Sequence, residues 1–358
     1  MRTKIIAALL AVLTALGGLN LFKSIKDRLT QPATAQTSEV VEFADVSGER
    51  TSKIRVRVKA KNSVQRAKRD RVRASGAFEV MIEERFKVRA GQTLAIYVNR
   101  ADVEIETGSV DEANIRVTLE SNHMEKAIER FERMNFQVAQ VGDEVRIESE
   151  SPRNNWNWNG KFAINIFVTI PQEFNAELRT THGDVELDDI NGFVLLNTTH
   201  GDISAQSISG PQISLVSTHG DIEASSLQSN EIVLKTTHAD IEIGEVDSKH
   251  FTAETSHGDV TIERLTGDSD ITTSHGNIDI ALLNNFSSEV KTSHGDVTVY
   301  TPSNIAAELD LEGSQVRVSS GYDLSGSVKK DRVKGLINGG GSKIRARTTH
   351  GSIELKNR

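Results

Sequence analysis

The sequence contains no cysteine, which excludes disulfide-bonded scaffolds and metal sites built on thiolates. Aromatic residues make up only 5% of the 358 residues, and prolines number 5. Because bulky rings normally fill wide protein interiors, their scarcity argues against one large conventional core. Charged residues at 26% and hydrophobic residues at 37% exclude a multi-span membrane protein. A thin core that repeats along the chain fits this composition.

The net charge of −8 averages two segments of opposite sign. Residues 50–73, here called the basic neck, hold eleven Lys and Arg against one acid, a net charge of +10. Residues 176–300 hold 21 Asp and Glu against five Lys and Arg, a net charge of −16. The neck (Arg50–Arg73) lies within a predicted linker, residues 36–75, which is either simply solvated or contacts anionic lipid or the acidic body. Because the neck lacks interleaved aromatic residues, we expect no nucleic-acid partner.

The N-terminus resembles an export signal. An apolar run over residues 5–22 follows Arg2 and Lys4, and an Ala-Thr-Ala cleavage motif ends at Ala35. A charged stretch separates the run from this motif, which also fits an uncleaved transmembrane helix. Residues 1–35 are therefore predicted to be a signal peptide or a membrane anchor. Either reading places the body in the periplasm, on the cell surface or outside the cell.

One phrase, Thr/Ser-His-Gly-Asp followed by Val or Ile, recurs along the second half of the chain. An eighth copy lies 56 residues beyond the seventh, and we expect two degenerate coils to fill that interval. The first seven copies are 18 or 19 residues apart, and their histidines are His182, His200, His219, His238, His257, His275 and His294.

Apolar residues occupy fixed positions around each of these histidines, at six and four before it and at three, five and eight after it. Steps of two indicate strands, and the odd gaps indicate bends, so each period is predicted to hold two or three very short strands. Coils stacked about 4.8 Å apart would pair every backbone group. The sequence therefore predicts an all-β fold, a single-stranded parallel β-solenoid with ~19-residue coils. A right-handed coil is favoured because parallel crossovers are usually right-handed.

The turn residues have predicted roles of their own. Glycine after the histidine permits a positive φ at the bend, and the following Asp can accept a backbone N–H. Residues 176–358 are expected to consist of these regular repeats. Ala239 replaces the glycine in the fourth copy, so glycine is not indispensable there.

Residues 76–175 are predicted to begin the same solenoid and to close its end. An amphipathic helix over residues 122–134, capped by Ser121 or Asn122, is expected to seal the open core. Trp156 and Trp158, the only tryptophans, lie in a predicted exposed loop that either packs on this cap or stacks on a sugar or partner surface. Strands are expected around residues 86–88, 94–98, 103–106, 115–119, 145–148 and 162–169.

Several stretches resemble a known family. The lead-in Ile-Pro-Gln-Glu-Phe-Asn at residues 170–175, the serial Gly-Asp-Ile/Val turns and the late Ile-Asn-Gly-Gly-Gly-Ser stretch are similar to the bacterial putative-adhesin family of β-strand-repeat domains. The resemblance covers about residues 85–356 and implies a solenoid with a surface or envelope role and no established chemistry. In that family the residue before the turn glycine is often Asn or Ser, so serial histidine is a departure.

Three interpretations of the histidine and aspartate rows remain open. In the first, each histidine fills a turn position and bonds along the stack. In the second, the rows bind Zn, Cu or Ni weakly at many sites, and in the third they form a pH-responsive surface. An enzyme is not expected, because catalysis needs a local, non-repeated cluster and the sequence offers none. No cofactor is predicted. We expect an exported envelope protein that acts as a non-catalytic adhesin or rigid display surface and binds a glycan or an envelope protein. The alternatives are an envelope scaffold or sensor that binds a protein partner, or weak metal binding by the histidine and aspartate rows.

Overall fold

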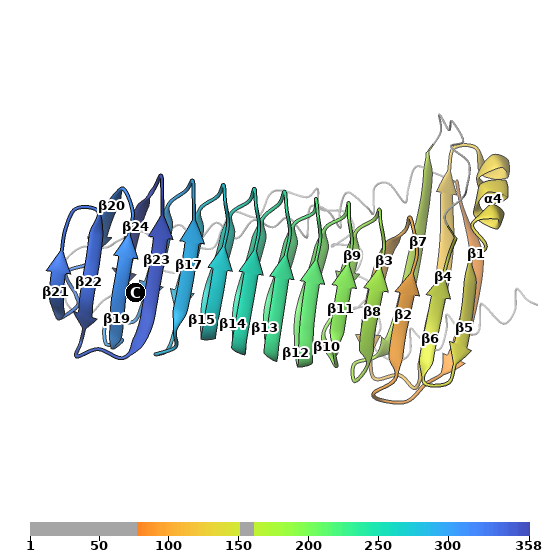
Figure 1. Ribbon diagram of the computed structural model, residues 1–358. Helices are drawn as coiled ribbons and strands as arrows, with labels where there is room; N and C mark the ends of the chain where they lie inside the picture. Colours follow the sequence, from red (N-terminus) through yellow and green to blue (C-terminus); the bar gives the residue numbers. More distant parts are fainter. Residues whose placement is uncertain (1–76, 151–160) are drawn as a thin grey trace, which may run out of the picture. The chain divides into compact units, whose positions relative to one another are not determined.

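The computed structural model describes residues 77–150 and 161–358, which belong to one compact unit, Ser75–Arg358. These residues form 24 strands and one helix, arranged as a stack of β-coils (Figure 1). The predicted signal or anchor, the basic linker and the loop with Trp156 and Trp158 lie outside the described residues. Among the described residues, no helix has the length and apolar character needed to cross a membrane.

The middle of the stack is a parallel β-solenoid, as predicted. Each coil pairs with the next in a constant register, so that Ile203 lies opposite Ile222 and Ile222 opposite Ile241. The strands of this part are β8 (Asn175–Arg179), β9 (Val185–Leu187), β10 (Ile190–Asn191), β11 (Val194–Asn197), β12 (Ile203–Val216), β13 (Ile222–Lys235), β14 (Ile241–Glu254), β15 (Val260–Thr272), β16 (Ile278–Leu282), β17 (Ser288–Thr292) and β18 (Val297–Thr301).

The strands of the central coils are longer than the sequence pattern indicates. β12, β13 and β14 are each 14 residues long and run unbroken from one histidine turn to the next, where two or three short strands were expected. The alternation of buried and outward-facing residues is interrupted between the buried Ala224 and the buried Leu227, three residues apart, and this interruption is a bend inside one strand. Neighbouring coils bend at the same place, so their hydrogen bonding continues around the bend.

The core is one coil wide and consists mainly of Val, Ile and Leu. Ile213, Ile232 and Phe251 stack on one another at the same position of successive coils, and all three are buried. Phe251 and Phe174 are the only aromatic residues among the largest fully buried side chains of the described ranges. This narrow interior accounts for the low aromatic content of the chain.

At the N-terminal end the coils are not stacked in sequence order. β2 pairs with β8 on one side and with β6 on the other, and β3 lies in the same way between β9 and β7. The coil formed by β2 and β3 comes first in the sequence, but the coil formed by β6 and β7 lies outside it in the stack. Antiparallel strands extend both faces: β4 and β1 follow β7, and β5 follows β6. The bounds are β1 (Ala77–Lys87), β2 (Thr93–Tyr97), β3 (Asp102–Gly108), β4 (Glu112–Ser121), β5 (Gln137–Val141), β6 (Glu144–Glu148) and β7 (Phe162–Pro171). The predicted strands are confirmed, and β5 was not predicted.

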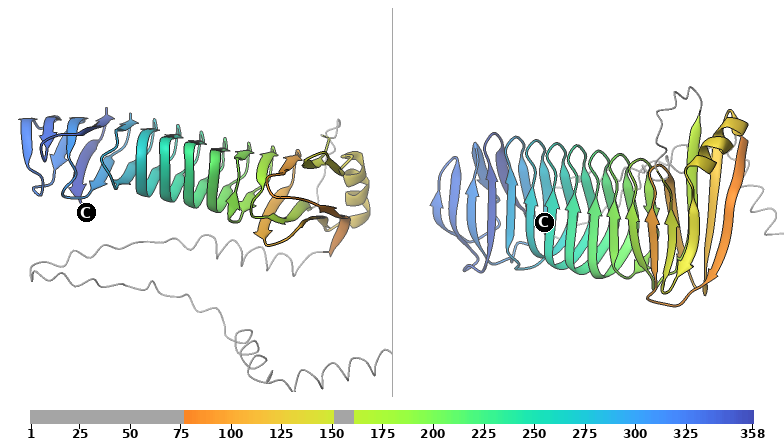
Figure 2. Two further views of the ribbon diagram at one scale, coloured as in Figure 1. Left: turned by 90° about the horizontal axis from the view of Figure 1, so that it is seen from below. Right: turned by 45° about the vertical axis from the view of Figure 1, so that its right-hand side comes forward.

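The expected helix, α4 (Met124–Arg133), lies at this end of the stack (Figure 2). The predicted helix is present, and its buried Ala127 and Phe131 pack on the core at this end. The predicted caps are wrong, because the residue at the N-cap position is His123 and it makes no side-chain capping bond. Ser121, two residues before the N-cap, accepts the backbone N–H of His123 at 3.0 Å. Its hydroxyl also donates to the carbonyl of Lys161, 2.8 Å away, and thereby ties the end of β4 to the start of β7.

The C-terminal end contradicts the expected pair of degenerate coils. β23 and β24 pair directly with β17 and β18, so the coil of His350 stacks on that of His294. The intervening residues form the outer layers: β19 and β20 pair with the far sides of β23 and β24, and β22 and β21 follow antiparallel. Residues 176–358 are thus not regular throughout. The bounds are β19 (Ala307–Glu312), β20 (Gln315–Val318), β21 (Leu324–Val328), β22 (Arg332–Ile337), β23 (Ser342–Thr348) and β24 (Ser352–Asn357).

Candidate functional site

The Thr/Ser-His-Gly-Asp turns lie one above another along one edge of the stack, here called the histidine edge. Two residues before six of the eight histidines, that is, all except His182 and His200, a buried Thr or Ser hydroxyl donates to the backbone carbonyl of the turn in the preceding coil. These bonds are 2.9–3.2 Å long and stabilise each turn against its neighbour. The donors are Ser217, Thr236, Thr255, Thr273, Thr292 and Thr348.

Glycine follows the histidine because the backbones of successive turns approach closely. A Cβ on Gly220 would lie 1.8 Å from the carbonyl oxygen of Gly201, and the other turn glycines are as confined. The expected positive φ is found in this row only at Gly183, at 133°, and at Gly295, at 159°, so it is not the general reason for glycine here. Ala239 is the one residue in this row that is not glycine. The rings on either side of its neighbour His238 are the most widely separated of the edge, with centroids 4.9 and 5.3 Å from that of His238.

The aspartates form a second set of bonds along the stack. The Oδ1 atom of each accepts the backbone N–H at the equivalent position of the next coil at 2.7–3.1 Å, which confirms the predicted backbone role. These bonds to charged acceptors are stronger than neutral ones. The acceptors are Asp102, Asp184, Asp202, Asp221, Asp240, Asp259, Asn277 and Asp296.

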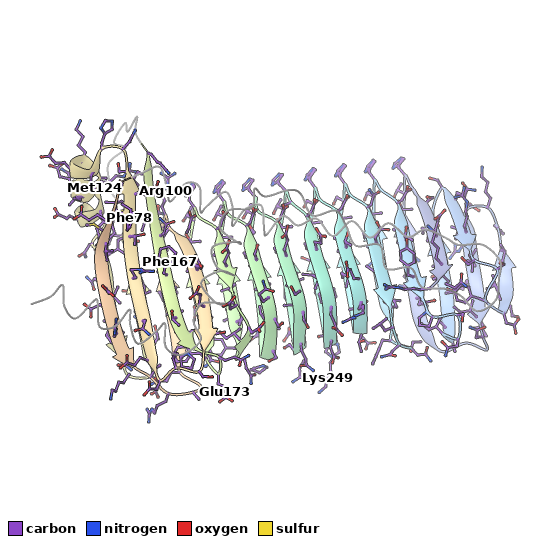
Figure 3. All side chains as sticks on the ribbon, turned by 180° about the vertical axis from the view of Figure 1, so that it is seen from behind. Phe78, Arg100, Met124, Phe167, Glu173 and Lys249 are labelled. Atoms are coloured by element: carbon purple, nitrogen blue, oxygen red, sulfur yellow. The ribbon has the colours of Figure 1, made fainter. Side chains whose placement is uncertain are left out.

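The structure brings all eight turn histidines into one row of stacked rings, from His182 to His350. Ring centroids are 4.6–5.3 Å apart and the planes differ by 1–9°. His182 is half-buried and the other seven are exposed. The row extends along the edge that carries the labelled Arg100 in Figure 3. The Nδ1 atom of His219 lies 3.2 Å from the carbonyl of Thr199, so this nitrogen carries the proton and Nε2 is the acceptor.

The fold does not require histidine at this position. Arg100 pairs with His182 at the equivalent position of the coil formed by β2 and β3, and Asp102 takes the aspartate role there. The sequence Asn-Arg-Ala-Asp is thus a degenerate copy of the turn, in which only Asp102 and the following Val103 match the phrase. Burial, followed by the charge of Arg100 and the neighbouring His200, lowers the pKa of His182.

The row does not form a metal chelate. The rings are parallel, so the lone pairs of neighbouring nitrogens are parallel as well and do not converge on one ion. A Zn–N bond of about 2.0–2.1 Å needs two nitrogens closer together than rings 4.6–5.3 Å apart provide. Within residues 77–150 and 161–358, no three His, Asp or Glu side chains are placed to hold a metal ion. The predicted histidines are therefore brought together, but without the geometry that coordination requires.

A non-repeated polar cluster, which sequence reasoning missed, lines an open hollow of about 400 Å³ on another part of the surface. His250, Asp268 and Asp270 stand beside Lys343 and Arg345, and these side chains come from coils far apart in the sequence. Arg345 lies 3.6 Å from the carboxylate of Glu289. The basic side chains here are therefore already paired with acids of the same surface.

Behind this hollow lies a buried carboxylate surrounded by arginines. Asp310 is 4% exposed, and Arg332, Arg345 and Arg347 all lie within 3.7 Å of its oxygens. Burial raises the pKa of Asp310, but the hydrogen bond from Arg332 and the charges of Arg332 and Arg347 outweigh it and hold this pKa below its ordinary value. The cluster joins β19, β22 and β23, which indicates a stabilising role at the reordered end.

The comparisons with known proteins agree with this architecture. A family model described as Toastrack DUF4097 matches residues 92–356. The chain belongs to this family. The expected resemblance to a family of β-repeat domains of unknown function is thereby confirmed. None of the curated proteins is similar in sequence to this Toastrack chain.

Solved structures similar to the Toastrack chain include three from Bacteroides and Parabacteroides species. A putative adhesin from Bacteroides fragilis NCTC 9343 is 13% identical, with a TM-score of 0.40 over 79% of this chain and 97% of its own. A putative adhesin from Parabacteroides merdae ATCC 43184 is 8% identical, with a TM-score of 0.42 over 78% and 97%. A putative lipid binding protein from Parabacteroides distasonis ATCC 8503 is 15% identical, with a TM-score of 0.36 over 78% and 97%. Similarity of this extent says nothing about function.

Proposed function

We propose that this Toastrack chain is an exported, non-catalytic rod of the bacterial envelope and that the histidine edge is its recognition surface. The main observation behind this proposal is the row of eight stacked imidazoles, seven of them exposed, at a position that the fold fills with Arg100 elsewhere. The buried hydroxyls, the glycines and the aspartates make the repeated contacts between turns, and His219 adds one ring bond to the carbonyl of Thr199. An exposed residue type that repeats without a structural need is expected to serve binding.

The rod also presents this edge rigidly. Every coil is hydrogen-bonded to its neighbours along the whole strand, and three separate rows of contacts fix the turns. Little conformational entropy is therefore lost when a ligand binds along the edge, which favours affinity from many weak contacts. An adhesive or display role agrees with the export signal predicted at residues 1–35.

The test is binding of the full-length exported chain to envelope preparations of bacterial cells, measured by co-sedimentation over a range of protein concentrations. Saturable binding that decreases when His219, His238 and His257 are changed to Ala is expected. Absence of saturable binding to any envelope fraction would contradict the proposed function.

A scaffold or sensor that binds a protein partner is the second candidate, and one observation favours it. β1 is an 11-residue edge strand at the helix-capped end, and its Phe78 and Val80 are 66% and 45% exposed. An exposed edge strand offers backbone groups for an added strand of a partner. Under this candidate, Phe78→Asp abolishes capture of an envelope protein and the histidine substitutions leave that capture unchanged.

A further inference from the structure

The histidine edge has a period and a length that restrict its ligand. Seven ring-to-ring steps of 4.6–5.3 Å make a straight row about 34 Å long. A ligand that contacts the whole row must be a linear polymer that repeats with nearly the same step. In an extended β-1,4-linked glycan each sugar is turned about half a revolution relative to the last, and this straight ribbon advances per sugar by close to the spacing of the coils.

We propose that the histidine edge binds an extended, uncharged β-1,4-linked polysaccharide, with one sugar opposite each coil. This inference rests on the proposed function and names the ligand class of its surface. Because the step of the polymer is close to the step of the rod, one sugar lies opposite each coil, and every second sugar presents the same groups to the same side chains. Contacts that are weak singly then add along the row.

The exposed groups of the edge match the hydroxyl groups of sugars. With its proton on Nδ1, His219 presents Nε2 as an acceptor, and the residue before each histidine adds a hydroxyl that can both donate and accept. This second column is half-buried or exposed and contains only hydroxyl residues, namely Thr181, Thr199, Thr218, Thr237, Ser256, Ser274, Ser293 and Thr349.

Two other polymeric or extended occupants fit the edge less well. A polyanion is repelled by the acidic body, in which residues 176–300 carry a net charge of −16. A second copy of the rod would share the period, but an edge only two or three side chains wide and about 34 Å long falls short of the ~1,000 Å² that specific interfaces bury.

The test is affinity electrophoresis of the full-length chain in native gels that contain soluble hydroxyethylcellulose or glycol chitin, both β-1,4-linked. Gels with dextran, an α-1,6-linked glucan, serve as the reference polymer. The edge variant is His219→Ala, His238→Ala and His257→Ala, which divides the row into runs of two and three rings. The control variant is Gln212→Ala, Glu231→Ala and His250→Ala, three exposed residues in register with one another beside Lys249, on the edge opposite Arg100 (Figure 3).

At pH 8 the wild-type chain and the control variant are expected to be retarded by at least one of the β-1,4-linked polymers and not by dextran. The edge variant is expected to lose at least tenfold in apparent affinity. The inference is wrong if neither β-1,4-linked polymer retards the wild type, if dextran retards it equally, or if the edge and control variants behave alike. In each case saturable envelope binding in the co-sedimentation experiment would leave the proposed function standing, and its absence would overturn both.

Discussion

The row of aspartate bonds allows a quantitative test of how the turns are held. In Asp202→Ala, the backbone N–H of Asp221 loses the carboxylate oxygen that lies 2.9 Å away. A hydrogen bond to a charged group contributes about 1.5–3 kcal/mol, and a buried donor left without a partner costs about 1–3 kcal/mol. Because Asp221 is half-buried and water replaces part of the bond, we expect a loss of about 1–2 kcal/mol.

The chain contains the matched control for this substitution. Asn277 occupies the aspartate position of its coil and accepts the N–H of Asp296 through Oδ1 at 2.9 Å. Asp202→Asn keeps the acceptor and is therefore expected to lose much less stability than Asp202→Ala. Equilibrium unfolding in urea measures both, and amide hydrogen exchange at Asp221 locates the effect. Equal losses in the two variants, or unchanged exchange at Asp221 in Asp202→Ala, would refute the reasoning.

Four further outcomes follow from the geometry. Gly220→Ala should lower the free energy of unfolding by about 1–3 kcal/mol, because its Cβ overpacks the turn. Ala239→Gly should change this free energy by no more than about 1 kcal/mol. Urea unfolding of the two variants measures both values. Ile232→Ala, which empties a fully buried core position, should cost about 2–5 kcal/mol in the same assay. Burial and the neighbouring groups lower the pKa of His182 in the folded state, so the unfolded state binds the proton more readily. The folded state therefore loses stability as the pH falls from about 6.5 through the lowered pKa. His182→Gln should remove this loss, and parallel plots of stability against pH for the wild type and the variant would contradict this expectation. The basic neck (Arg50–Arg73) should bind vesicles with anionic lipid and release them as salt is raised, and binding that is insensitive to salt would contradict an electrostatic contact.

The repeated part of the fold could be predicted because one period determines which side chains face the core and how successive coils pair. Apolar spacing around each histidine determines which side chains face inward, and identical spacing in successive periods determines their register, as in the stack of Ile213 on Ile232. The same logic predicted the backbone role of the aspartates. It could not reveal why glycine follows the histidine, because the close approach of Gly220 to Gly201 is a contact between coils and leaves no mark on local backbone preference.

The two ends could not be predicted for a different reason. Alternation shows that Leu309 and Leu311 face a core, but it does not show which coil their strand pairs with, and the structure places β23 between β17 and β19. The Arg100 turn escaped notice because it lacks the Thr or Ser, the His and the Gly of the phrase and keeps only Asp102 and the following Val103. The hollow beside His250 escaped as well, since its lining comes from separate coils and from the strand that returns out of order.

The central claim is that the histidine edge serves binding and not folding. The most direct measurement takes the variant His219→Ala, His238→Ala and His257→Ala and determines both its unfolding free energy and its binding to envelope preparations. We expect an unfolding free energy within about 1.5 kcal/mol of the wild type, as for three surface substitutions, together with a large loss of binding. A variant that is strongly destabilised, or one that binds as the wild type does, would contradict the claim.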